Sequence, residues 1–271
     1  MCAFSKDDVK LGVIGCGKMA NAILGGIAKH KFMRSDDIYV YDINMESSGA
    51  LCREYGFKEA YSIKDLAQNT DVILLATKPF VVAEVLSELN EYNKNHLILS
   101  ILAGVKIKKY FEFIKNARVI RIMPNTPALV NEGASAICAD STISNDELDF
   151  AFNLMSTCGK VIKTTEDKID IITALSGSGP AFYFKIIELM ANSATKLGLN
   201  KDEALLLSTQ TALGSAKMIY ENDFNIQQLI KNVTTPGGCT EVGNDVLLNS
   251  NIEKIFDELI QKTMQKAIDL G

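Results

Sequence analysis

A glycine-rich segment near the N-terminus has the residue types and spacing that hold the pyrophosphate of a dinucleotide. The stretch from Gly12 to Ala20 reads GVIGCGKMA, fits the pattern G-x-G-x-x-A, and lies between a strand-like run and a helix-like run. In this pattern Gly15 allows a tight turn, Gly17 lets the backbone approach the pyrophosphate, and Ala20 permits close packing of helix on strand. The amides that open the helix then point at the phosphates. A glycine-rich turn without a ligand is the alternative, and the order of strand, turn and helix favours dinucleotide binding.

The acidic residue Asp42 ends the next strand-like run, where it can contact the ribose of such a cofactor. It lies about 22 residues beyond Ala20, close to the interval of about 20 expected for this role. Its carboxylate would accept hydrogen bonds from the ribose hydroxyls and repel a 2′-phosphate. The competing interpretation is that Asp42 caps the following helix. The sequence therefore favours NADH as the cofactor, and NADPH stays an alternative.

Three loops follow later strand-like runs and contain polar residues and prolines. They comprise residues 76–79, 102–105 and 123–127. In a doubly wound sheet the carboxyl ends of the strands meet at one edge, where ligands bind. Prolines at strand exits are also ordinary turn residues, which would explain each loop by itself. The three loops together predict a nicotinamide pocket.

Two further loops are rich in small residues and each precedes a helix-like stretch. They comprise residues 176–181 (SGSGPA) and 234–240 (TTPGGCT). Their amides and hydroxyls could bind a carboxylate without a basic side chain. The alternative is a pair of helix caps. Their pairing beside a dinucleotide-binding pattern favours a substrate site.

The elements that position these residues follow from the apolar pattern. Short runs rich in Val, Ile and Leu predict strands buried on both faces of a parallel sheet, and the amphipathic stretches between them predict helices of βαβ units. The predicted strands are 10–15, 38–41, 72–76, 97–102 and 119–123, with further candidates at 134–138 and 160–163. The predicted helices are 19–31, 46–55, 64–68, 81–89 and 146–158. The fold class is α/β, with an N-terminal doubly wound Rossmann domain.

Beyond about residue 165 the strand signals end and helical patterns take over. We expect a Rossmann domain over 1–165 and an all-helical dimerisation domain over 166–271. The predicted helices of the second domain are 181–197, 201–220, 241–248 and 252–270. The segment 181–191 is apolar on almost every face, so it must be buried in its own domain or against another chain. Because a helical domain of this size cannot bury so much apolar surface alone, we expect an intimate homodimer.

Composition and charge limit the classes of function. The 271 residues are 47% hydrophobic and 23% charged, with 28 basic residues, 33 acidic residues and a net charge of −5. Without an excess of positive charge, we expect neither nucleic acid nor a membrane surface as a partner. The apolar runs are too short to span a membrane, and the N-terminal residues do not resemble a signal peptide. We therefore expect a cytoplasmic protein.

The cysteines and histidines do not form a metal site. No CxxC pair occurs, and no histidine lies near a cysteine, so we expect no zinc. Scattered single thiols are typical of reduced, mostly buried cysteines. The six cysteines are Cys2, Cys16, Cys52, Cys138, Cys158 and Cys239. His30 and His96 lie in contexts that do not indicate catalysis, which weakens any mechanism built on a histidine base.

Five motifs in this chain resemble those of the pyrroline-5-carboxylate reductase family. They are GCGKMA, TKP, MPNTPA, ALSGSGPA and VTTPGGCT, in that family's order and spacing from about residue 10 onward. The resemblance implies reduction of 1-pyrroline-5-carboxylate to L-proline by NADH or NADPH, the last step of proline biosynthesis. It also implies a Rossmann domain, a helical dimerisation domain, and a homodimer whose copies assemble into a ring of dimers.

Matched motif by motif, the resemblance also implies roles for single residues. The cofactor contacts are Gly15, Gly17, Lys18, Met19, Thr77, Lys78, Ala103 and Asn232, besides Asp42. The substrate contacts are Glu166, Thr235, Gly238, Cys239 and Thr240. Two positions depart from the family pattern, because Cys239 stands where Thr or Ala is usual and Phe182 where Tyr is usual. A carboxylate contact from the backbone amide survives the change at Cys239.

The chemistry that this family performs suits the residues present. A protonated cyclic imine is already electrophilic at carbon, so hydride transfer needs placement more than a strong acid or base. Thr240 is the catalytic candidate, because its hydroxyl could hydrogen-bond the ring nitrogen and relay a proton from water. The amides of residues 238–240 and the Thr235 hydroxyl would hold the carboxylate.

Two other functions remain as alternatives. A β-hydroxyacid dehydrogenase places a lysine close behind a Gly-x-Gly loop, whereas Lys185 follows Gly179 by six residues, which is too far along the helix. A dinucleotide-binding sensor without turnover would have no need of the intact loop 234–240. The sequence therefore favours the imine reductase.

Overall fold

The computed structural model describes residues 9–271, so the predictions for Cys2 and the first eight residues lie outside the described part. The chain forms two compact units. The first comprises the residues up to Ser178 together with Thr263–Gly271, and the second comprises Gly179–Lys262. The predicted boundary between residues 165 and 166 stays a prediction. The residues just after it are anchored in the first unit, where Ile169 and Ala174 are fully buried.

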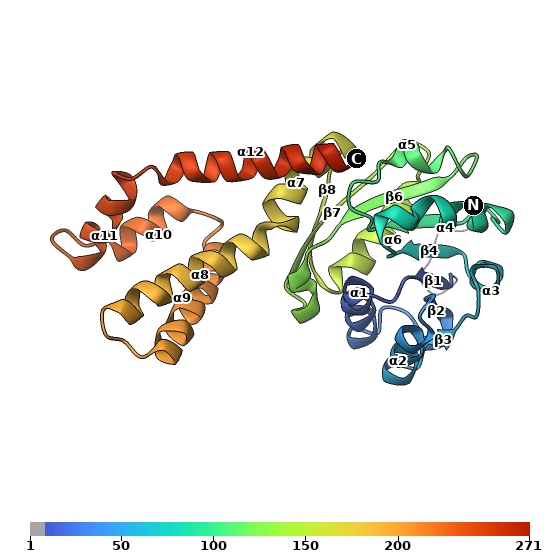
Figure 1. Ribbon diagram of the computed structural model, residues 1–271, viewed down its shortest axis with the longest axis horizontal. Coiled ribbons are helices and arrows are strands. Elements are labelled where there is room, and N and C mark those ends of the chain that lie inside the picture. Colours follow the sequence, from blue (N-terminus) through green and yellow to red (C-terminus); the bar gives the residue numbers. More distant parts are fainter. Residues whose placement is uncertain (1–8) are drawn as a thin grey trace. The chain divides into compact units, whose positions relative to one another are not determined.

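The first unit is built on one eight-stranded sheet, drawn in Figure 1. Its strand order is β3-β2-β1-β4-β5-β6-β7-β8. The strands are β1 Leu11–Ile14, β2 Ile38–Tyr41, β3 Lys58–Glu59, β4 Val72–Leu75, β5 Leu97–Ser100, β6 Arg118–Met123, β7 Gly133–Ala139 and β8 Gly159–Lys163. Every residue of β1, β4 and β5 is buried. Their continuous apolar runs therefore mark the centre of the sheet, as the sequence predicts.

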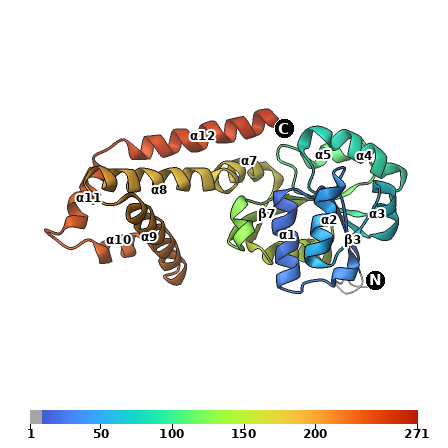
Figure 2. The same ribbon diagram turned by 60° about the horizontal axis from the view of Figure 1, so that its bottom comes forward.

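Helices cover both faces of this sheet. They are α1 Lys18–Lys29, α2 Met45–Tyr55, α3 Ile63–Asn69, α4 Val82–Glu91, α5 Ile107–Tyr110, α6 Asn145–Ser156 and α7 Ile169–Ile172. Val72 and Leu74 of β4 pack in one apolar cluster with α1, α2 and α6. Their neighbours Ile73 and Leu75 pack in the other, with α3, α4 and α5. Figure 2 shows α1 and α2 on one side of the sheet and α4 and α5 on the other, which confirms the doubly wound fold.

One strand direction departs from the parallel pattern. Strands β1 to β6 pair in parallel, whereas β7 pairs antiparallel with β6, and β8 runs parallel to β7. The connection over residues 124–132 explains the reversal. A parallel return needs a crossover of a dozen or more residues, and this segment is shorter.

The second unit is helical throughout. Its helices are α8 Gly179–Lys196, α9 Lys201–Glu221, α10 Ile226–Val233, α11 Cys239–Leu248 and α12 Ile252–Leu270, the end of which belongs to the first unit. Helix α10 was not predicted. Its signals are Asn225, whose side chain accepts from Gln228 N at 3.1 Å as the N-cap, and apolar residues at helical spacing.

The segment predicted as the loop 176–181 is helical instead, so that prediction is wrong. Residues Thr173–Gly177 form one π-helical turn, and Ser178 N donates to Thr173 O at 2.8 Å. Glycine and serine favour loops only when their backbone groups lack helical partners. Here the Ser176 hydroxyl donates to Ile172 O at 3.0 Å, and Pro180 lies in the first turn of α8, where its missing N–H costs nothing.

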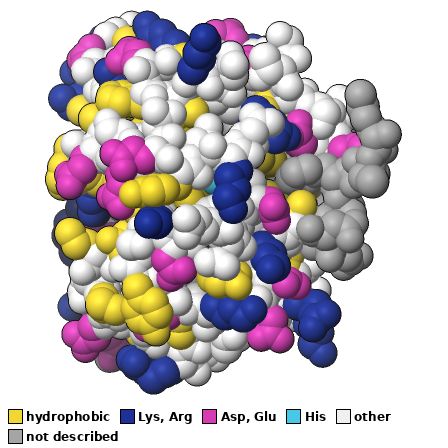
Figure 3. Space-filling model, turned by 90° about the vertical axis from the view of Figure 1, so that its right-hand side faces the viewer, with side chains coloured by type: hydrophobic (Ala, Val, Ile, Leu, Met, Phe, Trp, Pro, Cys, Tyr) yellow, Lys and Arg dark blue, Asp and Glu magenta, His cyan; other side chains and the backbone are white. Residues whose placement is uncertain are grey.

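No helix within residues 9–271 is long and apolar enough to cross a membrane. In the same range, no group of three or more His, Cys, Asp and Glu side chains could hold a metal ion. On the face of the molecule drawn in Figure 3, basic and acidic side chains are interspersed. The expectation that nucleic acid is not a partner stays a prediction.

Candidate functional site

A cavity of about 1010 Å³ lies at the carboxyl edge of the sheet in the first unit. All the predicted cofactor residues of this unit line it: Gly15, Gly17, Lys18, Met19, Asp42, Thr77, Lys78 and Ala103. The three predicted loops contribute 76–79, 102–103 and 123–126. Ligands bind at this edge in doubly wound folds because the loops that follow successive strands converge there. The structure thus brings together segments that are far apart in the sequence.

The turn between β1 and α1 requires glycine at two places for different reasons. Gly15 has φ +97°, and a Cβ there would lie 2.7 Å from the carbonyl of Ala76, so only glycine allows β1 and β4 to approach at this point. Gly17 has an ordinary φ of −74°. A Cβ at Gly17 would meet no other atom of the described residues within 4 Å apart from its chain neighbours and helix backbone. The space beside Gly17 is open to a ligand.

Helix α1 starts without a capping side chain. Its N-cap residue is Gly17, no side chain caps it, and no acidic residue lies in its first turn. The first amides of a helix have no intrahelical acceptor. At the wall of the cavity, they present hydrogen-bond donors that suit a phosphate group.

Asp42 holds the glycine turn in place. Its Oδ2 accepts from Cys16 N at 2.7 Å, and its Oδ1 accepts from Asn44 N at 2.9 Å. The N-cap of α2 is Asn44, whose side chain accepts from Glu46 N. The alternative in which Asp42 caps the helix is therefore wrong. Asp42 instead ties the end of β2 to the turn that would hold a pyrophosphate.

Thr77 supplies the strongest sign that the cavity takes a polar ligand. Its Oγ1 is buried and has no hydrogen-bond partner among the residues that the structure describes, and Thr77 lines the cavity. Buried hydroxyls are almost always satisfied, because an unmade hydrogen bond is costly. A bound dinucleotide has many hydroxyl, amide and phosphate groups, and one of these would supply the hydrogen-bond partner that Thr77 Oγ1 lacks.

The side chain of Asn125 holds the cavity wall formed by residues 123–126 to neighbouring segments of the first unit. Its Nδ2 donates to Ser176 O at 3.0 Å and its Oδ1 accepts from Ala134 N at 2.8 Å. Gly177 also lines the cavity, and a Cβ there would lie 2.5 Å from the terminal methyl of Met123. The π-helical turn therefore packs directly against this wall.

Sequence reasoning missed two large apolar side chains at the cavity. Ile43 is 93% exposed and Phe80 is 84% exposed, and both line the cavity. Each follows closely on a polar residue at a strand end, Asp42 or Lys78. An exposed aromatic or branched side chain at such a place suits the flat face of a base. The position of each apolar residue just after a polar strand end is the sequence signal that indicates it.

Glu166 does not line this cavity. Its Oε1 accepts from Ile107 N at 2.7 Å and from Arg121 Nη1 at 3.1 Å. Both partners lie in the first unit. The structure therefore places Glu166 in a network of the protein's own groups, and its predicted contact with substrate stays untested.

The other predicted substrate residues lie in the loop after α10 and in the first turn of α11, in the second unit. Gly238 N donates to Thr235 O at 2.9 Å, and a Cβ at Gly238 would lie 2.5 Å from Thr235 Oγ1. Glycine is needed there because the turn is so tight. Gly238 is the N-cap of α11, so Cys239 and Thr240 are its first two residues, and both are exposed. Where helix caps are the alternative for this loop, the cap residue is Gly238 and not Thr240.

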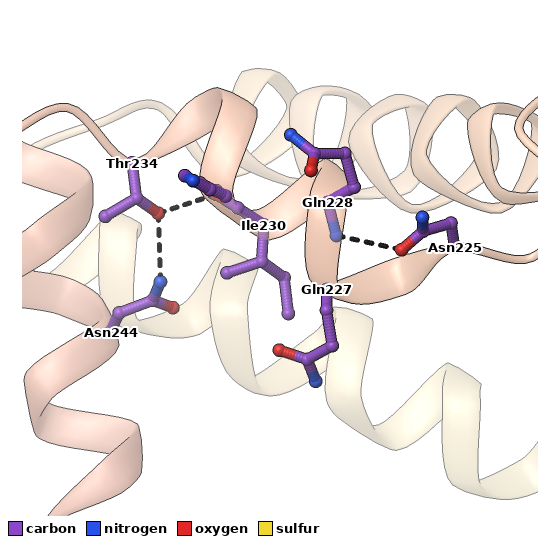
Figure 4. Close-up of a pocket in the computed structure, with 7 residues that line it drawn as sticks. Asn225, Gln227, Gln228, Ile230, Thr234 and Asn244 are labelled. Carbon is purple, nitrogen blue, oxygen red and sulfur yellow. Dashed lines mark hydrogen bonds between the residues drawn. The ribbon is translucent and has the colours of Figure 1, made fainter.

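A second cavity of about 480 Å³ lies beside this loop, shown in Figure 4. Thr234 closes one side of it, donating to Ile230 O at 2.8 Å and accepting from Asn244 Nδ2 at 3.1 Å. These bonds tie the start of the loop to both α10 and α11. Asn232, the remaining predicted cofactor residue, is exposed on α10, and its Oδ1 accepts from Gln228 Nε2 at 2.7 Å. It does not line this second cavity.

The two histidines and Cys16 of the glycine turn do not line the cavity. His96 is buried, its Nε2 lies 2.9 Å from Ala67 O, and burial lowers its pKa. His30 Nδ1 lies 3.0 Å from Gly26 O. Burial raises the pKa of Cys16 to about 12, with the nearby Asp42 charge adding to the shift. Its thiol therefore stays neutral at physiological pH.

Two family models match parts of this chain. Residues 10–104, which carry most of the cavity, match the family model described as NADP oxidoreductase, coenzyme F420-dependent. The chain is thus an oxidoreductase that uses a nicotinamide dinucleotide. Residues 166–270 match the model of pyrroline-5-carboxylate reductase dimerisation, which supports a homo-oligomer.

Relatives over the full length give the particular family. A pyrroline-5-carboxylate reductase of Methanosarcina acetivorans is 33% identical over 267 residues, covering 98% of this chain and 99% of the relative. A solved structure of such a reductase from Coxiella burnetii is 33% identical, with a TM-score of 0.94 over 98% of this chain and 99% of that chain. A Plasmodium falciparum structure with NADP bound is 28% identical, with a TM-score of 0.86 over 98% and 99%. The chain belongs to the pyrroline-5-carboxylate reductase family.

Proposed function

We propose that this chain reduces 1-pyrroline-5-carboxylate to L-proline, the last step of proline biosynthesis. The observation that carries the proposal is the cavity in which every predicted cofactor residue of the first unit meets. The unpartnered Thr77 hydroxyl supports a polar ligand there. The family to which the chain belongs supplies the substrate class.

The bound dinucleotide supplies the hydride, and the chain's own residues bind and orient the reactants. The first-turn amides of Cys239 and Thr240 have no intrahelical acceptor and suit the substrate carboxylate, with the Thr235 hydroxyl as a further donor. The Gly238 amide already donates to Thr235 O, so its proposed part is to shape the turn. The exposed Thr240 hydroxyl would hold the ring nitrogen and pass a proton to it from water. Such placement is what hydride transfer to a protonated imine requires.

For the cofactor we propose a preference for NADH. The Asp42 carboxylate lines the cavity at the end of β2, where it would repel the 2′-phosphate of NADPH. Its contact with Cys16 N keeps it beside the glycine turn. The relative from Plasmodium falciparum holds NADP, so the preference must be measured for this chain.

We propose a homodimer, assembled into a ring of dimers, as the working form. The apolar segment 181–191 was expected to be buried on every side, yet in the single chain four of its large side chains are more than half exposed. They are Tyr183, Phe184, Leu189 and Met190, at 67%, 65%, 53% and 59%. A second copy would bury them, and the matched dimerisation model agrees with this assembly. The free cysteines support a reducing compartment such as the cytoplasm, which a tagged chain would locate by microscopy.

The test is oxidation of NADH by the purified chain with 1-pyrroline-5-carboxylate, compared with a panel of 2- and 3-hydroxy acids in the reverse direction. Turnover with the imine alone supports the proposal. Turnover with a hydroxy acid would favour a β-hydroxyacid dehydrogenase. The lysine that such an enzyme needs is not supplied by Lys185, which is exposed and pairs with Glu188 at 2.6 Å. Binding of NADH without turnover on any of these would favour a sensor.

A further inference from the structure

A row of residues that pair in register across three strands carries the buried polar side chains of Ser100 and Arg121. Ser100 on β5 pairs in register with Arg121 on β6, which pairs in register with Cys138 on β7. The Arg121 side chain is 3% exposed. A buried guanidinium is costly unless its donors are paired. The partners of Arg121 therefore indicate what this row does.

Arg121 binds carboxylates that follow β8. Its Nη1 lies 3.1 Å from Glu166 Oε1, and its Nη2 lies 4.0 Å from Asp170 Oδ1. The same Glu166 oxygen accepts from Ile107 N at 2.7 Å. Ile107 opens α5, whose N-cap residue Lys106 makes no side-chain cap. Glu166, held by Arg121, thus caps α5 from a distant part of the chain.

Tyr110, the last residue of α5, links this helix to Ser100 on β5. It is fully buried, and its hydroxyl is hydrogen-bonded to Ser100 Oγ. Ser100 Oγ also accepts from Leu102 N at 3.3 Å. Burial raises the pKa of Tyr110 to about 12, so the phenol keeps its proton at physiological pH.

Between these two attachments runs the loop over residues 101–106. Ile101, Leu102 and Ala103 line the cavity. Gly104 has φ +76°, and a Cβ there would lie 2.9 Å from Leu270 O. The loop is therefore attached at its start through Ser100, at its end through Ile107, and packed against the C-terminal residues at its tip.

We infer that Ser100, Tyr110, Arg121 and Glu166 form a loop anchor that positions the cavity wall at 101–103 for the nicotinamide end of the cofactor. The inference rests on the proposed function. It makes Glu166 a positioning residue that acts through the loop, where the family resemblance implies a substrate contact. The adenosine end of the cofactor lies with Asp42 and the glycine turn, which the loop anchor does not touch.

The test compares two ligands that differ in the nicotinamide. In Tyr110→Phe, Ser100 loses one hydrogen bond without a change in side-chain shape. We expect the affinity for NADH to fall about threefold to tenfold, as the loss of one hydrogen bond gives, while the affinity for ADP-ribose stays unchanged. Both constants are measured by calorimetry on the full chain. A ratio of the two affinities equal to that of the unchanged chain overturns the inference.

Tyr55→Phe is the matched control. Its hydroxyl donates to Asn21 Oδ1 at 3.2 Å within the same unit, and Tyr55 does not line the cavity. We expect this variant to bind both ligands as the unchanged chain does. If Tyr55→Phe lowers NADH affinity selectively as well, the effect is not specific to the loop anchor, and the inference fails.

Glu166→Gln separates the two roles of Glu166. It keeps an oxygen for Ile107 N but removes the charge that Arg121 binds. A positioning role predicts weaker NADH binding in the absence of substrate. A higher KM for 1-pyrroline-5-carboxylate with unchanged NADH affinity would instead make Glu166 a substrate contact and overturn the inference. Absence of turnover in the unchanged chain counts against the proposed function alone, because both binding constants are read without the imine.

Discussion

Thr240 does not cap α11, so its proposed catalytic role is separate from helix capping. The cap is Gly238, and the Thr240 side chain is exposed in the first turn. Its hydroxyl therefore does not cap the helix, so helix capping does not explain the threonine at this position. Its proposed partner is the imine nitrogen of the substrate.

We expect Thr240→Val to lower kcat/KM about tenfold to 150-fold, because a hydrogen bond to a charged group contributes about 1.5–3 kcal/mol. Thr240→Ser keeps the oxygen and should keep most of the activity. Steady-state rates and thermal midpoints of both variants provide the check. A lowered melting temperature with unchanged turnover in Thr240→Val would return this residue to a structural role.

Asp42 combines two functions in one carboxylate. One is its contact with Cys16 N, which holds the glycine turn, and the other is its proposed repulsion of a 2′-phosphate. In Asp42→Ser we expect the preference for NADH over NADPH to narrow, and KM for both cofactors to rise because the turn loses an acceptor. The measurement is kcat/KM with each cofactor.

Asp71→Ser is the control for Asp42, because Asp71 Oδ2 accepts from Lys10 N at 2.9 Å at the opposite end of β1. This variant loses the same kind of contact away from the cavity, so its ratio of kcat/KM with NADH to kcat/KM with NADPH should not change. An unchanged ratio in Asp42→Ser would remove Asp42 from cofactor selection.

At the scale of elements, the turn between β1 and α1 gives a paired prediction. Gly15→Ala places a Cβ 2.7 Å from the Ala76 carbonyl at φ +97°, so we expect a loss of stability of about 1–3 kcal/mol. Gly17→Ala meets open space at an ordinary φ and should keep its stability. Its methyl would occupy the space proposed for the pyrophosphate, so cofactor affinity should fall.

Thermal unfolding and cofactor titration of the two alanine variants distinguish these effects. Gly17→Ala that binds cofactor as tightly as the unchanged chain would move the pyrophosphate away from this turn. Equal melting temperatures for Gly15→Ala and the unchanged chain would contradict the close approach of β1 and β4.

For the whole molecule, the exposed apolar side chains of α8 lead to a prediction about assembly. We expect the chain to sediment as a dimer or larger species with concentration-dependent stability. Phe184→Asp should shift it toward the monomer, because a charge would replace a side chain that the partner buries. Lys115→Glu, an exposed change in the first unit, is the control for added negative charge. A stable, folded monomer of the unchanged chain at low concentration would rule out an obligate dimer.

Local patterns in the chain were enough to predict most of the long helices and central strands and the glycine turn. Continuous apolar runs identify β1, β4 and β5 because strands buried on both faces exclude polar residues. The amphipathic pattern predicts α12 over 252–270 with the bounds that the structure has. The motifs also identify the family, because their residue types and spacing are tied to one fold and one chemistry.

Contacts between distant residues were decided only by the tertiary structure. The π-helical turn at 173–177 and the pairing of Arg121 with Glu166 have no local signature. Each depends on which strand or loop becomes a neighbour once the sheet has formed, and periodicity within a segment does not encode that choice. For the same reason, the substrate contact of Glu166 stays a prediction, and only the fold shows that its carboxylate accepts from Arg121 and from Ile107 N at the start of α5.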